Sequence, residues 1–598
     1  MTSLSGPMEV DIIFVGGGTS ACVAAGRLAA ANPELHVLLV EQGPNNFQDP
    51  AVLTPALFMD HLAPDSKHAI FWKGNKSEAA KGREAIVPTG GILGGGSSIN
   101  IMMYARAAAS DYDDWNTTGW TSADLIPILQ KIETYHVAPG RDTHGYDGPI
   151  HVSYGDHFAQ VAQEYLDVCT KRDIPKVEDL MDLYTGHGCA RLAKYIHPET
   201  GHRQDAAHRY IHGQSGNKRL HVMTKTLVKR ILFDGTKAVG VEVIGNKNQD
   251  KDANQTPREI RARKLVVVSA GAIGSAVVLQ RSGLGQANQL SELGIKVVAD
   301  LPVGANYEDH SSCIATYHVA DDLETLDLVM ERDPSVMERY LAQFIHGKGL
   351  LTSNVTDAGS KIRPTAEELE RIGPAFREVW KRQFESAPDK PVFIQTVVNG
   401  FLGPRTAVPK NSRFMMFGHI AAYPVSKGHV HITSADPYSL PDFSTGFFEE
   451  KADVEIQVWV YKKTREIARR MPSYRGEYAP LHPKYPEGSS ASCVRLDSSP
   501  SFNMEDLVYT EEDDIAIEEF VRQRGDTTWH SVATIQMKPK EKGGCVDSRL
   551  NVYGTENLKV ADLSILPKNV GSNTYSTALL IGEKAALLIA EDLKLVSP

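Results

Sequence analysis

The sequence predicts an α/β protein in which a split domain with a parallel sheet accompanies an α+β domain with an antiparallel sheet and helices. Two apolar runs, residues 12–15 and 264–270, lead straight into glycine turns and helix-forming stretches, as buried strands of a parallel sheet do. A short apolar strand followed by a helix is predicted again within residues 558–593. Between these parts, residues 311–527 hold hairpins and helices in separate blocks, which is typical of an α+β arrangement.

We therefore expect the chain to pass back and forth between two domains. Its 598 residues are enough for at least two domains, and they contain neither an internal repeat nor a low-complexity tract. The expected segments are 1–155, 205–310 and 528–598 for the parallel-sheet domain, and 156–204 and 311–527 for the α+β domain.

The first predicted strand runs into a dinucleotide-binding fingerprint. Residues 16–21 read GGGTSA, with Ala21 in the position of the third glycine. Gly16 permits the tight turn, and Gly18 lets the backbone approach a pyrophosphate. The start of the following helix adds free N–H groups and positive dipole charge for the phosphates. The candidate phosphate-binding residues are Gly16, Gly18, Thr19 and Ser20.

A second strand, residues 36–40, ends at Glu41. An acidic side chain at this point of the fingerprint binds ribose hydroxyls. Because strand, turn, helix, strand and acid follow in order, the sequence favours dinucleotide binding over the alternative, a glycine-rich turn of an ordinary βαβ unit.

A second glycine-rich loop occupies residues 82–115, which contain six glycines. A flexible linker is the bland interpretation, but residues 99–104, INIMMY, are apolar and bulky. Glycine-rich loops beside buried side chains are usually binding loops. We therefore expect this loop to approach a ligand.

The remaining elements follow from apolar periodicity. Alternation and an Asp-Gly turn predict a β-hairpin over residues 221–243. Thr365 and Glu368 form a capping box, and residues 413–432 predict strand, turn and strand. Helices are expected at 124–135, 158–172, 276–281, 336–345, 375–384, 454–471 and 577–593.

Composition excludes several classes of partner. The net charge is −11 and no long basic stretch is present, so neither nucleic acid nor a membrane is expected as a partner. No apolar run reaches transmembrane length, and the N-terminus lacks the pattern of a secretory signal. The sequence does not determine the oligomeric state, and a homo-oligomer is one possibility. His429 and His431 share a strand, but no third ligand has fitting spacing, so no metal site is predicted.

The six cysteines are scattered and form no CxxC pair, which indicates reduced thiols in a cytosolic-type compartment. We expect an intracellular, cytoplasmic protein. The last three residues are not a peroxisomal address.

Six ordered blocks together resemble the glucose–methanol–choline (GMC) family of flavoprotein oxidoreductases. The fingerprint at residues 16–21 matches the FAD-binding turn of that family, and residues 302–310, PVGANYEDH, are similar to its LPGVGxNxxDH stretch. The other blocks are 82–104, 269–285, 529–531 and 571–584. Within the family the sequence is most similar to fungal alcohol (methanol) oxidases. Those oxidases carry a longer segment ahead of the catalytic histidine and a C-terminal peroxisomal address, and we expect this chain to lack both.

The resemblance implies that FAD binds in the split, Rossmann-like domain and that the substrate binds in the α+β domain. His530 is then the base for the alcohol proton while hydride leaves for flavin N5, and Asn573 donates to the alkoxide-like oxygen. Family members with a histidyl–flavin bond carry His where Ile99 stands, so FAD is expected to bind non-covalently. The further cofactor-binding residues are Gly95, Ser97, Asn100, Ile101, Met102, Met103, Val228, Ala270, Asp562 and Thr574.

Each assignment has a structural alternative. Taken alone, His530 is more often a packed or capping histidine, and Asn573 is also a fitting N-cap for the last helix. Asp562 fits a turn residue after a strand. Met102 and Met103 fit an ordinary core stripe.

The function implied by the resemblance is that of an FAD-dependent alcohol oxidase, which turns a primary alcohol and O₂ into an aldehyde and hydrogen peroxide. A lyase or cyclase of the same family, without net redox chemistry, is the alternative from another class. A dehydrogenase or a formate oxidase ranks lower. In formate oxidase an arginine stands where Asn573 stands here.

Overall fold

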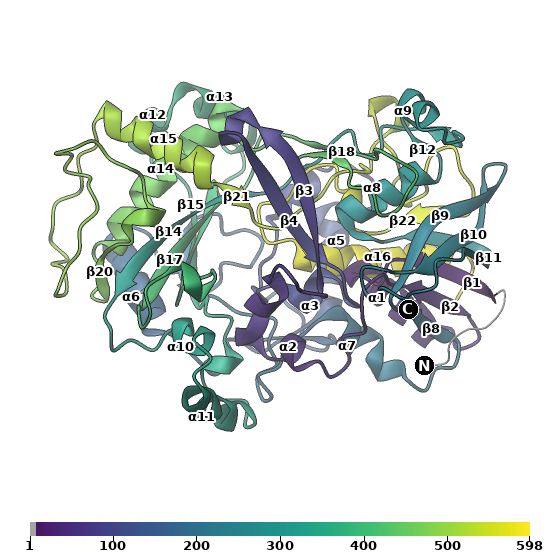
Figure 1. The fold of residues 1–598 in the computed structure, drawn as a ribbon, viewed down its shortest axis with the longest axis horizontal. Helices are drawn as coiled ribbons and strands as arrows, with labels where there is room; N and C mark the ends of the chain where they lie inside the picture. The colour runs from purple at the N-terminus through teal and green to yellow at the C-terminus, as the bar shows by residue number, and fades with distance from the viewer. Residues whose placement is uncertain (1–7) are drawn as a thin grey trace.

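A computed structural model describes residues 8–598 and contains two seven-stranded sheets (Figure 1). The first sheet lies in the right half of the view and the second in the left half. The hairpin of β3, Ala69–Ser77, and β4, Arg83–Gly90, runs between them in this view. In the described part of the chain no helix is long and apolar enough to cross a membrane. The expectation about a secretory signal concerns a terminus whose residues 1–7 lie outside the described residues.

The first sheet combines strands from three distant parts of the chain, which confirms an α/β fold. Its parallel centre places β1, Met8–Val15, between β2, Val37–Val40, and β11, Arg258–Val268. Val37–Val40 and Ile12–Val15 form buried apolar runs, as strands covered on both faces require. The other strands are β8, Leu220–Met223, β9, Thr226–Asp234, β10, Lys237–Gly245, and β22, Leu558–Val560.

The predicted hairpin over residues 221–243 is partly wrong. Its turn joins β9 and β10 as expected. Residues 220–223, however, form β8, which pairs in parallel with β2. Local alternation cannot distinguish a hairpin strand from a strand that pairs with a distant segment.

Three helices lie next to the glycine turns that follow β1 and β11. α1, Thr19–Ala31, packs on α16, Tyr575–Asp592, while α8, Gly271–Arg281, follows β11 directly. A Cβ at Gly582 would lie 2.6 Å from the Cβ of Val23, so glycine in α16 permits the close approach of α1. The first and last helices of the chain therefore lie side by side.

The second sheet is antiparallel and has helices against one face. The strand order is β20, β14, β17, β16, β15, β7, and β21 pairs with β14. The central strands are β14, Ser311–Val319, β17, Phe414–Ala421, and β16, Phe393–Val398. Their helix-facing side chains form a core with α14, Lys451–Ala468. The outer strands are β7, Gly188–Arg191, β15, Ala358–Ile362, β20, Tyr474–Glu477, and β21, Asp526–Thr527.

Residues 413–432 do not form one strand pair. β17 pairs with β14 and β16, whereas β18, His429–His431, pairs with β19, Asp442–Ser444. The bend after β17 carries the chain out of the sheet instead of back along it.

The predicted helices are present with shifted ends. The Thr365 capping box is formed, but residues 133–135, predicted as helix, are strand β5, Glu133–Tyr135. The predicted helices not yet described are α5, Ser122–Ile132, α6, Gln160–Lys171, α11, Pro334–Phe344, α12, Ala366–Ile372, and α13, Pro374–Gln383. A further helix, α15, Glu511–Arg524, was not predicted. The five-segment division into domains stays a prediction.

Candidate active site

A cavity of about 590 Å³ is lined by residues of both sheets. All the cofactor-binding and catalytic candidates named from the sequence line this one cavity. They are Gly16, Gly18, Thr19, Ser20, Glu41, Gly95, Ser97, Asn100, Ile101, Met102, Met103, Val228, Ala270, His530, Asp562, Asn573 and Thr574.

The first glycine turn has the geometry of a phosphate-binding turn. Gly16 has φ +101°, and a Cβ there would lie 2.5 Å from the Ser269 carbonyl oxygen. The N-cap Gly18 gives α1 no side-chain acceptor, so the first N–H groups of the helix are left for a ligand. Gly95 in the second glycine loop has φ +57°, and a Cβ there would lie 2.8 Å from the Gly18 Cα. The two loops can therefore approach each other only because glycine stands at position 95. The space beside the start of α1 is suited to a pyrophosphate.

Glu41 is buried beside this turn. Its Oε2 accepts from the backbone N–H of Gly17 at 2.9 Å, and its Oε1 accepts from Gly43 at 2.8 Å. Burial raises the pKa of Glu41 to about 7. A carboxylate has about four lone-pair sites, so both oxygens can accept further hydrogen bonds from a sugar.

Asp562 acts on the turn at the start of α8. Its Oδ2 accepts from the Gly271 N–H at 2.9 Å and from Ser275 Oγ at 2.5 Å, and its Oδ1 accepts from the Ser564 N–H at 2.9 Å. Burial raises the pKa of its carboxyl group. The residue thus organises a turn and lines the cavity, so both sequence interpretations fit its position.

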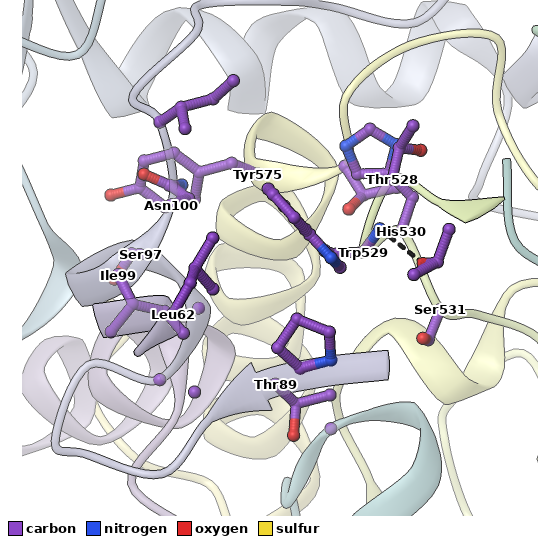
Figure 2. Close-up of a pocket in the computed structure, with 18 of the residues that line it drawn as sticks. Leu62, Thr89, Ser97, Ile99, Asn100, Thr528, Trp529, His530, Ser531 and Tyr575 are labelled. Atoms are coloured by element: carbon purple, nitrogen blue, oxygen red, sulfur yellow. Dashed lines mark hydrogen bonds between the residues drawn. The ribbon is translucent and has the colours of Figure 1, made fainter. Parts of the chain in front are cut away.

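His530 and Asn573 meet at the cavity surface. Asn573 Nδ2 lies 3.2 Å from His530 Nε2, so the amide donates and Nε2 accepts. Nδ1 of His530 lies 2.8 Å from Thr528 Oγ1 and 2.9 Å from His310 Nδ1. This network assigns the neutral tautomer with the proton on Nδ1. Figure 2 shows Thr528, His530 and Ser531 on one side of the pocket, across from Ser97, Ile99 and Asn100.

The surroundings keep both histidines neutral. Burial, and then the neighbouring His310, hold the pKa of His530 well below its usual value. Burial lowers the pKa of His310 to about 4. A neutral imidazole with an unprotonated Nε2 can accept a proton at neutral pH.

Asp309, which sequence reasoning did not single out, fixes the loop that carries His530. Its Oδ1 accepts from the backbone N–H groups of His530 at 2.9 Å and His310 at 2.7 Å. Its Oδ2 accepts from the hydroxyls of Tyr307 at 2.9 Å and Thr527 at 2.5 Å. Burial raises the pKa of Asp309 to about 6. The Asp-His pair that ends residues 302–310 was the available clue.

The helix-cap interpretation of Asn573 is wrong. α16 begins at Tyr575, its N-cap is Thr574, and no side chain caps it. Asn573 Oδ1 is buried and has no hydrogen-bond partner in the described residues. Met102 and Met103 are buried in the main core and also line the cavity, so their position fits both interpretations.

Comparisons with known proteins agree with this geometry. The N-terminal GMC oxidoreductase family model matches residues 10–312, and the C-terminal model matches residues 424–582. The chain is 43% identical to an alcohol oxidase of Pichia angusta over 98% of this chain and 96% of that protein. The match to a formate oxidase structure covers 99% of this chain and 100% of that chain, at a TM-score of 0.84 and 23% identity. The match to the structure of an FAD-dependent oxidoreductase from Chaetomium thermophilum covers 98% of this chain and 100% of that chain, at a TM-score of 0.81 and 24% identity. The chain belongs to the GMC oxidoreductase family.

Proposed function

We propose that this chain is an FAD-dependent alcohol oxidase that converts a primary alcohol and O₂ into an aldehyde and hydrogen peroxide. The observation that carries the proposal is the contact of 3.2 Å between Asn573 Nδ2 and His530 Nε2 in the cavity that also holds the glycine turns. The identity of 43% to an alcohol oxidase along nearly the whole chain supports it.

The residues of the cavity fit FAD. Gly16, Gly18, Thr19 and Ser20 would hold the pyrophosphate, and Glu41 would hold the ribose. The residues that would hold the rest of the cofactor are Gly95, Ser97, Asn100, Ile101, Met102, Met103, Val228, Ala270, Asp562 and Thr574. When bound, FAD supplies the two-electron acceptor for the alcohol and passes the electrons to O₂. We propose non-covalent binding, because Ile99 offers no nucleophile next to Asn100.

His530 and Asn573 have different proposed roles toward the substrate. In this proposal His530 Nε2 accepts the hydroxyl proton of the alcohol, and the Asn573 amide donates to the same oxygen as negative charge develops there. The hydrogen bond between Nδ1 and Thr528 holds the ring in the tautomer that leaves Nε2 unprotonated. Burial of His530 favours the neutral base.

The test separates the oxidase from its alternatives. Purified holoenzyme is mixed without air with primary alcohols from methanol to 1-octanol and benzyl alcohol, and flavin absorbance is followed. An oxidase bleaches with alcohol and recovers with O₂ while one H₂O₂ forms per aldehyde. Bleaching without rapid recovery in O₂ indicates a dehydrogenase. Absence of bleaching with every alcohol overturns the proposal and moves a lyase or cyclase forward.

Formate is the second substrate to include in that panel. A formate oxidase shares the fold, at 23% identity. Asn573 places an uncharged amide beside His530, which favours an uncharged alcohol over a carboxylate. We propose a cytoplasmic location from the six free cysteines, all of which lie in the described residues. Subcellular fractionation would test it.

A further inference from the structure

One face of the second sheet forms a continuous wall of the cavity. Ile314, Gly418 and Thr396 are paired across β14, β17 and β16 and form one row. Thr316, Met416 and Val398 form the next row. These six residues, here called the sheet wall, lie on the face opposite to α14.

Gly418 leaves a hollow in the middle of the wall. It is the one residue of β17 that is not buried, while its paired neighbours carry full side chains. A Cβ at Gly418 would approach only the Thr396 Oγ1 within 4 Å, at 3.3 Å, so protein packing does not require glycine here. Glycine inside a strand weakens it and often marks the close approach of a ligand.

The strand that carries the wall begins near His530, where the reaction is proposed to occur. β21 pairs with the first residues of β14, with Ser311 opposite Thr527, and His530 follows three residues after Thr527. From Ser311 to Thr316 the strand extends roughly 17 Å at about 3.4 Å per residue. A one-carbon alcohol at His530 would leave most of the wall uncovered.

The wall is uncharged and largely apolar. Of the charged residues that line the cavity, Glu41 and Asp562 lie at the turns of the first sheet. Arg524 and Asp526 lie at the end of the wall nearest β21, where Asp526 pairs with Ser312 of β14. Phe401, which follows β16, adds a further apolar side chain. Ile314, Met416 and Val398 favour burial of hydrocarbon, and none of the six wall residues offers a charge to an ionised group.

We propose that the sheet wall binds the hydrocarbon part of the substrate, so that the preferred substrate is an apolar primary alcohol larger than methanol, with a medium-length chain or an aromatic ring. Gly418 is the specificity-determining position, since its missing side chain opens the hollow. This inference rests on the alcohol oxidase function proposed above.

Chain-length dependence tests the inference on the holoenzyme. The kcat/KM values for methanol, 1-butanol, 1-hexanol, 1-octanol and benzyl alcohol are measured as peroxide formation. We expect kcat/KM to rise about threefold to fourfold per added methylene group while the wall is being covered. Benzyl alcohol should also exceed methanol by more than tenfold. Methanol as the best substrate of the series would overturn the inference, whereas failure of every alcohol would overturn the proposed function itself.

Variants then locate the effect on the wall. Gly418→Val should lower the ratio of kcat/KM for 1-octanol to that for methanol by tenfold or more, and Gly418→Ala should lower it less. Met415→Leu is the matched control, because Met415 lies on the same strand but in the core on the helix-facing side. Its ratio should stay within twofold of the parent. If Gly418→Val does not fold, Ile314→Phe fills the same row from a position that already carries a side chain. An unchanged ratio in the folded variant would overturn the assignment of the wall.

Discussion

Asn573 donates its side-chain amide to Nε2 of His530 across 3.2 Å. The pair joins the segment after β21 to the segment before α16, and both residues line the same cavity. A donor and an acceptor at this separation can both contact one oxygen atom of a bound alcohol. The predictions below treat them as a unit.

Asn573→Asp should keep FAD and lose most of its turnover. A carboxylate repels the developing alkoxide and removes one donor, and loss of one such donor typically costs ~10²–10³ in rate. Anaerobic stopped-flow reduction of the flavin measures the step, and the flavin spectrum of the purified variant is the control for binding. Reduction at the parent rate would show that Asn573 has no role toward the substrate.

The acid limb of the pH profile should lie below the ordinary histidine pKa, which is about 6.5. Burial and His310 lower the pKa of His530, so its imidazole stays unprotonated as the pH falls past that value. Because the base acts only in its neutral form, kcat/KM should remain at its plateau at pH 6.5 and fall only at more acidic pH. A half-maximal value at or above pH 6.5 would contradict this assignment.

Asp309→Ala should destabilise the fold and slow catalysis together. The change leaves two buried N–H groups and two hydroxyls without their acceptor, and removing one partner of such a network costs about 1–3 kcal/mol per unsatisfied group. Thermal unfolding and anaerobic flavin reduction report the two effects. Asp309→Asn keeps one carbonyl oxygen for the backbone donors and should recover part of both. If neither variant lowers the unfolding temperature, the loop is not held by this carboxylate.

The sequence was sufficient for the parts of the site whose residues are neighbours in the chain. The glycine turn before α1 and Glu41 after β2 belong to one local βαβ pattern, and their geometry follows from backbone demands. A residue such as Gly16 can be interpreted alone, because its φ of +101° is one that glycine readily adopts and other residues rarely do.

The parts that sequence reasoning missed depend on contacts between distant segments. Asp309 holds the His530 backbone across 221 residues, and no local periodicity encodes that pairing. The sheet wall likewise needs the registers of β14, β16 and β17, which lie up to about 100 residues apart. Pairing of β8 with β2 was missed for the same reason.

Acid precipitation should release yellow flavin into the supernatant. Ile99 offers no side-chain nucleophile next to Asn100, which is the reason for the proposed non-covalent binding. The absorbance of the supernatant after centrifugation measures the released fraction, with free FAD carried through the same procedure as the control. Colour that stays in the protein pellet would contradict non-covalent binding.

His530→Ala should retain FAD and its fold but slow anaerobic flavin reduction by ~10²–10⁴, the usual contribution of a positioned base. Retention is expected because the residues suited to the phosphates lie in the turns around Gly16 and Gly95, on other segments of the chain. The variant should become faster at high pH, where some alkoxide forms without a base. His310→Ala is the comparison: His310 contacts His530 at Nδ1 and does not line the cavity, so its loss should shift the pH profile more than the plateau rate. Reduction of His530→Ala at the parent rate would exclude His530 as the base, and the proton would then have to leave by another group in the cavity.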